Sequence, residues 1–378
     1  MNKLDDKLLE DIFRAYYDAR RNKRNSKSQL RFELNLEENL IELYNEINQR
    51  NYQVGRSICF ITFVPVKREV FAADFRDRVV HHLLYNYISP LFERTFIEDC
   101  YSCRKGKGTL YGIERCEHHI KSCSDNYRHN CYVLKLDIRG YFMHINRKKL
   151  YEIVMVSLNL YACRVAVPGK RWKDLLNYEL VGFLIKEVIF NDPTQGCEMR
   201  GKKEDWNGLP HSKSMFYSEE GCGLPIGNLT SQLFSNIYLT KLDNYVKRIL
   251  KEKHYGRYVD DFYIVHTDKQ HLTALIPQIR HFLQEELGLE LHPDKICLQC
   301  AGNGMPFLGT VLKPYRIYMK NNSKKRMWKH LMEMKQGMHT MPLHTWQATL
   351  NSYQGYMTHL KCFRLMNRIK NIKNMPMM

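Results

Sequence analysis

The sequence predicts an α+β fold, and three observations carry that prediction. Residues 132–138 form an apolar run typical of a buried strand, which ends at Asp137. Residues 255–266 contain two β-rich arms on either side of Asp260 and Asp261, the pattern of a hairpin with acids at its tip. Apolar residues at helical spacing fill much of the remaining chain. The 378 residues are enough for one large domain or for two to three subdomains that share interfaces.

The first 55 residues predict two helices joined by a basic run. Apolar residues recur at three- and four-residue spacing from Leu8 to Tyr17, which predicts an amphipathic first helix. A second helix is predicted after Asn35, an N-cap residue with Glu38 three positions later, and its buried stripe is Leu36, Leu40, Leu43 and Ile47. The run between the helices is predicted to contact phosphates, with a solvated linker as the alternative. Its cations are Arg20, Arg21, Lys23, Arg24, Lys27 and Arg31.

The later elements follow from the same periodicities. Residues 58–66 are β-rich, and helices are predicted over residues 75–92, 171–189 and 233–250. Residues 191–223 are polar and rich in Gly, Pro and Ser, which predicts a long loop or insertion. A further helix over residues 272–287 is expected to end at Gly288. The tail after Lys313 is predicted to be helical and basic.

The charge of the chain narrows the class of partner. Lys and Arg total 58 against 40 Asp and Glu, which gives a formal net charge of +18. Nucleic acid fits this charge because each cation that neutralises a phosphate releases a counterion, although a basic membrane-surface protein fits it equally well. The N-terminus lacks the uninterrupted apolar segment of a signal peptide, and the most apolar later stretch, residues 153–168, is too short to span a bilayer. We therefore expect a cytoplasmic protein with no membrane partner.

The twelve cysteines include two pairs with the spacing of half a zinc site, namely Cys100 with Cys103 and Cys297 with Cys300. The two pairs lie far apart in the sequence. A strand over residues 295–300 would point Cys297 and Cys300 to opposite faces of its sheet. Reduced thiols are the favoured interpretation, and a zinc site is the alternative that the sequence leaves open.

Adjacent carboxylates at a tight turn repel each other and destabilise the fold unless a cation neutralises them. Asp260 and Asp261 therefore indicate a hard metal ion such as Mg²⁺, with Asp137 at the end of another strand as a third ligand. Two ions held in this way would clamp the attacking and leaving oxygens of a phosphoryl transfer. The alternative is that the two acids only form a turn.

Six motifs give these acids a context, because they occur in the order found in reverse transcriptases. Tyr258-Val-Asp-Asp261 resembles the YxDD motif of that family, and residues 135–142, Lys-Leu-Asp-Ile-Arg-Gly-Tyr-Phe, resemble its first palm motif. Residues 68–78 and 102–109 resemble two fingers motifs. Residues 292–295 resemble the segment that carries a later palm lysine, and residues 306–309 resemble the primer grip.

The resemblance implies a right-hand polymerase fold with fingers, a palm, a short helical thumb and an N-terminal helical extension. The implied extension covers residues 1–55 and the fingers cover residues 56–131. The palm covers residues 132–315, with an insertion near residues 190–222, and the thumb covers residues 316–378.

The resemblance also implies a role for each matching residue. Asp137, Asp260 and Asp261 would be catalytic and, together with Ile138, would hold two Mg²⁺ ions. Phe142 would be the aromatic gate that excludes ribonucleotides, and Arg68 would meet the incoming deoxynucleoside triphosphate. The implied nucleotide-binding set is Lys67, Arg68, Phe142, Ile226, Gly227, Gln232 and Lys295. The implied set for template RNA and RNA/DNA hybrid is Arg20, Arg21, Lys23, Arg24, Arg104, Lys105, Lys107, Phe307, Leu308, Gly309, Lys324 and Lys325.

Several segments resemble a particular branch of the family, among them residues 35–39, 102–107, 206–216 and 351–356 beside residues 223–232. Residues 223–232, Gly-Leu-Pro-Ile-Gly-Asn-Leu-Thr-Ser-Gln, have Ile226 where group II intron and retroviral-type enzymes tend to carry Gln, and Gln232 where they tend to carry Pro. This form is similar to the reverse transcriptases of diversity-generating retroelements, which are bacterial or phage-encoded. It implies copying of a template-repeat RNA with errors opposite adenine, so that the cDNA diversifies a target gene. It also implies a small basic oligomeric accessory protein.

Two alternatives remain beside this interpretation. A group II intron, retron or defence-type reverse transcriptase would share the chemistry but not the biology. A catalytically silent, basic RNA-binding scaffold would share only the fold, and the presence of all three acids argues against it. Primer extension with and without Mg²⁺ would separate the scaffold from the enzyme.

Overall fold

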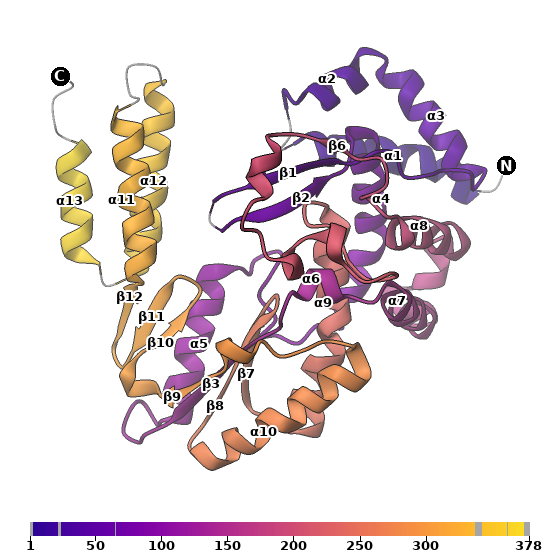
Figure 1. Ribbon diagram of the computed structural model, residues 1–378. Coiled ribbons are helices and arrows are strands. Elements are labelled where there is room, and N and C mark those ends of the chain that lie inside the picture. The colour runs from indigo at the N-terminus through magenta and orange to yellow at the C-terminus, as the bar shows by residue number, and fades with distance from the viewer. Residues whose placement is uncertain (1–2, 22–23, 65, 337–341, 361, 374–378) are drawn as a thin grey trace. The chain divides into compact units, whose positions relative to one another are not determined.

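The computed structural model describes residues 3–21, 24–64, 66–336, 342–360 and 362–373 (Figure 1). The chain divides into two compact units, each built from several segments. The first unit comprises Met1–Cys103, Ile138–Leu250 and Gln278–Pro293, and the second comprises Arg104–Asp137, Lys251–Pro277 and Asp294–Met378.

Helices form most of the first unit. They are α1 (Lys3–Arg20), α2 (Lys27–Leu34), α3 (Leu36–Asn48), α4 (Phe75–Phe92), α6 (Tyr141–His144), α7 (Arg147–Ala162), α8 (Tyr178–Phe190) and α9 (Leu229–Asn244). The predicted apolar stripe of α1 is buried at Leu8, Ile12 and Tyr16, and α1 packs on α4. Asn177 caps α8 by accepting a hydrogen bond from the Leu180 N–H, so this helix begins later than the predicted residue 171.

The first unit also contains a three-stranded sheet in the order β2-β1-β6. Strands β1 (Ile58–Thr62) and β2 (Arg68–Ala72) form an antiparallel hairpin, and β6 (Glu198–Met199) joins β1 in parallel, as Figure 1 shows. The predicted insertion is therefore not a bare loop, because its first part adds a strand to this sheet. Short 3-10 helices follow at Lys203–Trp206, His211–Lys213 and Met215–Tyr217. A small hairpin, β4 (Val165–Val167) and β5 (Lys170–Arg171), precedes a 3-10 helix at Trp172–Asp174.

A four-stranded sheet in the order β7-β8-β3-β9 organises the second unit. Its strands are β7 (His254–Tyr258), β8 (Asp261–His266), β3 (Tyr132–Asp137) and β9 (Cys297–Cys300), all paired antiparallel. Helix α5 (Thr109–Cys123) packs against β7 and β8. Helix α10 (Lys269–Phe282) begins in the second unit, and its residues from Gln278 on belong to the first. It continues into a π-helical turn at Leu283–Leu287, and Gly288 ends it in the left-handed conformation, as predicted. A second π turn, Tyr245–Ile249, extends α9 of the first unit.

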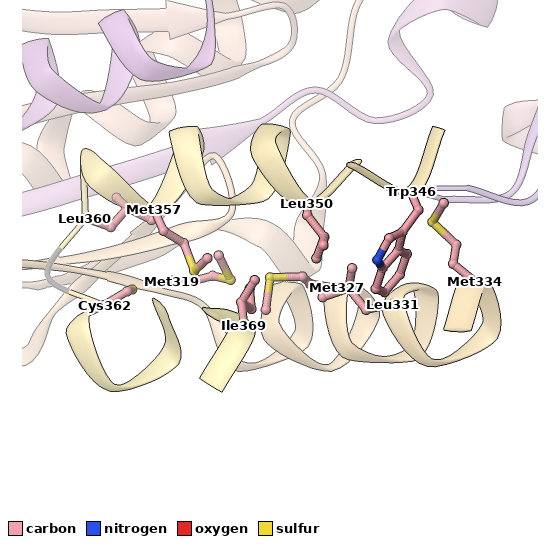
Figure 2. Close-up of a cluster of buried hydrophobic side chains, with 10 residues drawn as sticks. All are labelled: Met319, Met327, Leu331, Met334, Trp346, Leu350, Met357, Leu360, Cys362 and Ile369. Atoms are coloured by element: carbon pink, nitrogen blue, oxygen red, sulfur yellow. The ribbon is translucent and has the colours of Figure 1, made fainter. Parts of the chain in front are cut away.

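The C-terminal part of the second unit is a meander followed by three helices. Strands β10 (Met305–Phe307), β11 (Thr310–Lys313) and β12 (Arg316–Met319) pair in order. Helices α11 (Asn321–Gln336), α12 (Leu343–Thr358) and α13 (Phe363–Lys373) then form a cluster around buried side chains that include Trp346, Leu350 and four methionines (Figure 2). Methionine fills irregular gaps well, so this small core combines burial with an adaptable packing.

Most predicted elements are present, and the mixed helix-and-sheet fold class is confirmed. Besides the start of α8, the insertion and the strand over residues 295–300, which begins only at Cys297, two further local predictions were wrong. Helix α2 occupies part of the basic run, where no helix was expected. The Asn35 side chain makes no cap hydrogen bond to α3, although that helix begins where predicted. Among the residues that the structure describes, no helix is long and apolar enough to cross a membrane.

Candidate active site

Backbone pairing places two of the three predicted acids opposite each other. In the β3–β8 ladder Asp137 pairs with Asp261, the last of six consecutive pairs. Asp260 lies in the two-residue turn between β7 and β8. Val259, the other turn residue, has a φ of 58°, a left-handed conformation that is rare for a β-branched residue. The fully buried Arg257 donates a hydrogen bond to the Val259 carbonyl at 3.0 Å and so supports the turn.

Two lysines neutralise part of the negative charge. Lys295 Nζ lies 2.8 Å from Asp137 Oδ1, and Lys135 Nζ lies 2.9 Å from Asp261 Oδ2. Lys295 was predicted as a nucleotide contact, whereas Lys135 was not in the predicted site. The signal for Lys135 was present, because a strand has a period of two and residues 135 and 137 therefore share a face.

The acids remain costly to ionise in spite of these lysines. Burial raises the pKa of Asp260 to about 6, and the charges of Asp137 and Asp261 add to the effect. Burial also raises the pKa of Asp261, while Lys135 acts in the opposite direction. The site therefore favours an additional cation over three bare carboxylates.

The donor set fits a hard divalent ion. Asp261 Oδ1 is buried and has no hydrogen-bond partner in the part of the chain that the structure describes, so one ligand atom is available. The Ile138 side chain carries no ligand atom, so this residue, which is 1% exposed, could offer only its backbone carbonyl. Within the described ranges no three acid, His or Cys side chains are close enough to form a ready-made metal cluster. Lys295 and Lys135 each contact one carboxylate oxygen, so a metal ion bound there would compete with them.

Several predicted nucleotide contacts lie together within the first unit. Phe142 on α6 and Ile226 both pack against a cluster of Cys59, Phe71, Met143 and Met215. The Ile226 carbonyl accepts a hydrogen bond from the Phe71 N–H at 2.9 Å. Tyr141, the aromatic residue next to Phe142, is 2% exposed, and its hydroxyl donates to the Ser235 carbonyl, which leaves Phe142 as the more accessible ring.

The other predicted nucleotide contacts of the first unit differ in their surroundings. Gly227 has a φ of 131°, and a Cβ there would lie 2.9 Å from the Phe71 carbonyl, so only glycine allows this close approach. Arg68 begins β2 and is exposed, and Gln232 on α9 is also exposed. Lys67 is tied to the insertion, because its Nζ donates to the Asn207 carbonyl at 2.6 Å.

The predicted contacts to nucleic acid fall into three groups. In the N-terminal group Arg20 Nε pairs with Glu33 at 2.6 Å, so that this arginine joins α1 to α2. Arg21 lies 3.4 Å from Asp18 with its side chain 73% exposed, Arg24 is exposed, and Lys23 lies outside the described residues. A phosphate-binding role for these cations stays a prediction.

The second and third groups belong to the second unit. Cys103 and Gly106 take positive φ values in the basic turn that holds Arg104, Lys105 and Lys107, and Lys107 lies 5.1 Å from the centre of the Tyr111 ring. Leu308 and Gly309 form a tight turn between β10 and β11, while Phe307 is buried against Tyr263. Lys324 and Lys325 lie in the first turns of α11.

The cysteines are free thiols throughout the chain. Cys297 and Cys300 are the ends of β9, and the odd spacing places them on opposite faces of that strand, as predicted. This geometry does not let the two sulfurs chelate one ion together.

Comparison with known proteins places the chain in a family context. The model of a family described as "Reverse transcriptase (RNA-dependent DNA polymerase)" matches residues 68–312. The COX1/OXI3 intron 2 protein of Saccharomyces cerevisiae is 21% identical over an alignment of 299 residues, which covers 68% of this chain. The chain spans only 32% of that relative.

Two solved structures show a more distant likeness. Apo telomerase from Candida tropicalis gives a TM-score of 0.49 at 11% identity and covers 84% of this chain and 59% of its own. Telomerase from Candida albicans in complex with a TWJ fragment of telomeric RNA gives 0.47 at 12% identity, with 89% and 63% covered. Likeness at this level says nothing about activity.

Proposed function

Because the chain belongs to the reverse transcriptase family, the RNA-dependent DNA polymerases, we propose that it copies an RNA template into DNA. The observation that carries the proposal is the pairing of Asp137 with Asp261 at the hairpin whose turn holds Asp260. Family membership also implies the right-hand polymerase fold. The subdomain boundaries at residues 55, 131 and 315 are part of the proposal.

Two Mg²⁺ ions are the proposed cofactors. Asp137, Asp260 and Asp261, with the backbone oxygen of Ile138, are the groups that would hold them. Bound ions would lower the charge on the attacking and leaving oxygens during phosphoryl transfer. Lys295 would then be free to leave Asp137 and contact the triphosphate, because its side chain is 48% exposed and its present partner would be neutralised by metal.

The rest of the chain supplies selection and binding. Phe142 offers an apolar ring where a deoxyribose would lie, and it would crowd a 2′-hydroxyl. Arg68, exposed at the start of β2, offers a cation for the triphosphate. The net charge of +18 supports template RNA and RNA/DNA hybrid as partners. We also propose that the protein acts in the cytoplasm of a bacterium or of a phage-infected cell.

At a finer level, we propose that the enzyme belongs to a diversity-generating retroelement. The sequence Ile-Gly-Asn-Leu-Thr-Ser-Gln at residues 226–232 supports this, as does the insertion that contains Trp206. The products would be cDNAs with errors opposite template adenine, made with the help of a small basic oligomeric accessory protein. A second candidate is a group II intron enzyme, which the similarity to the yeast intron protein favours.

One experiment tests both levels. The purified protein is given an RNA template of mixed sequence, a primer and deoxynucleotides, with Mg²⁺ or with EDTA, and the products are sequenced. Mg²⁺-dependent extension that fails in Asp137→Asn supports the enzyme, whereas binding of RNA without extension indicates a silent scaffold. Errors concentrated opposite adenine support the retroelement assignment. Accurate copying of every template base would exclude it and favour the intron-type enzyme.

A further inference from the structure

Glu69 is a buried carboxylate that accepts three hydrogen bonds from the insertion. It lies on β2 directly after Arg68 and is 1% exposed. Trp206 Nε1 donates to Oε1 at 2.8 Å, Ser214 Oγ donates to the same oxygen at 2.9 Å, and the Met215 N–H donates to Oε2 at 2.6 Å. A buried carboxylate is tolerated only when such donors replace water, so these contacts belong together.

Arg68 and Glu69 are adjacent charged residues on β2, and their side chains lie in different surroundings. Arg68 is exposed and Glu69 is buried, since successive strand residues face opposite sides. The residue proposed to meet the triphosphate and the residue that holds the insertion are thus adjacent on one rigid strand. Any displacement of Glu69 would also displace Arg68.

The insertion is attached to the same unit at both of its ends. Its first part pairs with β1 through β6, and Lys67 binds the Asn207 carbonyl. At its other end the Gly221 carbonyl accepts a hydrogen bond from the Arg147 N–H at 2.9 Å, and directly after the insertion the Leu224 N–H donates to the Phe142 carbonyl at 2.8 Å. Gly140, just before α6, approaches the insertion so closely that a Cβ would lie 2.5 Å from the Ser212 carbonyl.

Met215 links Glu69 to Phe142 and Ile226, the residues proposed to select the nucleotide. Its backbone N–H is bound by Glu69, and its side chain is 4% exposed in the cluster with Cys59, Phe71 and Met143. Phe142 and Ile226 pack against this cluster. The position of Met215 therefore limits where both of these side chains can lie.

We propose that Glu69 is a positioning residue for nucleotide selection, which acts by holding Met215 in the cluster against which Phe142 and Ile226 pack. This inference rests on the proposed function and deepens it. The insertion becomes one wall of the selecting site, and Glu69 fixes that wall to the strand that carries Arg68. The reason for a carboxylate is geometric, because only an acceptor with two oxygens can take all three donors.

The test is the substitution Glu69→Gln, with Glu204→Gln as its matched control. A glutamine keeps the size of the side chain but turns one acceptor into a donor, so at least one of the three insertion donors loses its partner. Glu204 lies in the same insertion and is exposed. A second variant, Met215→Ala, leaves the backbone N–H that Glu69 binds and removes only the side chain that packs in the cluster.

Two measurements are made on each variant. The first is the ratio of ribonucleotide to deoxyribonucleotide incorporation, together with the error frequency at each template base. We expect this ratio to rise about three- to tenfold in Glu69→Gln, roughly the net worth of one hydrogen bond, and to rise in Met215→Ala as well because the cluster loses a side chain. The second is trypsin cleavage after Lys202, Lys203 and Lys213, which should accelerate in Glu69→Gln and not in Glu204→Gln.

The outcomes separate this inference from the proposed function. A parent protein that makes no DNA would refute the proposed function. A parent that makes DNA, with variants that lose speed or stability but keep the parental ratio, would overturn the positioning role alone. Unchanged cleavage in Glu69→Gln would overturn the attachment of the insertion by this residue. A changed ratio in both variants, with faster cleavage in Glu69→Gln, supports the inference.

Discussion

Asp260→Asn is expected to abolish DNA synthesis and, in the absence of divalent ions, to make the protein more stable. Burial raises the pKa of Asp260 to about 6, and repulsion from Asp137 and Asp261 contributes. Asparagine keeps the shape of the side chain and removes its charge. The repulsion is therefore relieved, while one proposed metal ligand is weakened.

The size of the gain follows from the pKa. A rise from 3.8 to about 6 is roughly two units, or about 3 kcal/mol when the group is ionised. The side chain is only partly shielded from water and salt, so we expect about 1–2 kcal/mol at pH 7.5. The raised pKa means that the folded state binds more protons, so the gain should be full above about pH 6 and absent below about pH 4.

The assay is thermal unfolding in EDTA and in Mg²⁺, with RNA binding and primer extension measured on the same samples. Asp125→Asn is the matched control, because Asp125 is an exposed acid paired with the exposed Arg128. Mg²⁺ should raise the melting temperature of the parent and of the control, but much less that of Asp260→Asn. Extension by Asp260→Asn at the parental rate would refute the metal site. A lower melting temperature than the parent in EDTA would refute the repulsion argument.

Four further predictions concern selection, binding and pH. Phe142→Val should raise ribonucleotide incorporation with a modest loss of deoxynucleotide synthesis, and unchanged sugar discrimination would place the gate elsewhere. Ile226→Gln should lower errors opposite adenine by up to about tenfold, because an amide restores a polar check on the base pair; frequent errors that persist in the variant would refute this mechanism. Affinity for unrelated RNA should fall as a power of salt concentration, and a flat response would show that the basic run does not contact phosphate. Burial lowers the pKa of His81 to about 3, so stability should fall by up to about 1.4 kcal/mol per unit as pH drops below about 6.5, and His81→Gln should flatten that slope in melts from pH 4 to 7.

Sequence patterns predicted best those elements whose signals are local. The hairpin around Asp260, the helix that ends at Gly288 and the strand that ends at Asp137 all depend on alternation or on a single turn residue, and all three are present. Helix α2 also had a local signal, since Ser26 caps it by accepting from the Gln29 N–H. The helix was missed because the run of arginines and lysines was interpreted by its charge alone.

Long-range contacts could not be predicted from the sequence. Nothing in residues 191–223 indicates that Glu198 will pair with Ile58, because the two lie 140 residues apart and a two-residue strand has no periodicity. The same is true of Glu69, which looks like one more surface acid in a charged stretch until its three donors are seen. Arg20 is the converse case, since Glu33 takes up a charge that seemed free for phosphate.

The geometry of the acids follows from the burial of the strands that carry them. Phe262, Tyr263, Ile264 and Val265 on β8 are at most 1% exposed, so a shift of one residue against β3 would disturb a core packed on both faces. That register is what brings Asp261 opposite Asp137. The left-handed conformation of Val259 destabilises the fold by about 1–2 kcal/mol, and each ionised acid destabilises it further. The six aligned residue pairs of the buried β3–β8 ladder stabilise the fold by more than these two effects together. The turn can be strained because the β3–β8 register, and not the turn residues, sets the position of the acids. A substitution in the middle of β8 should therefore impair the site more than a substitution that relieves the strain at Val259 would improve it.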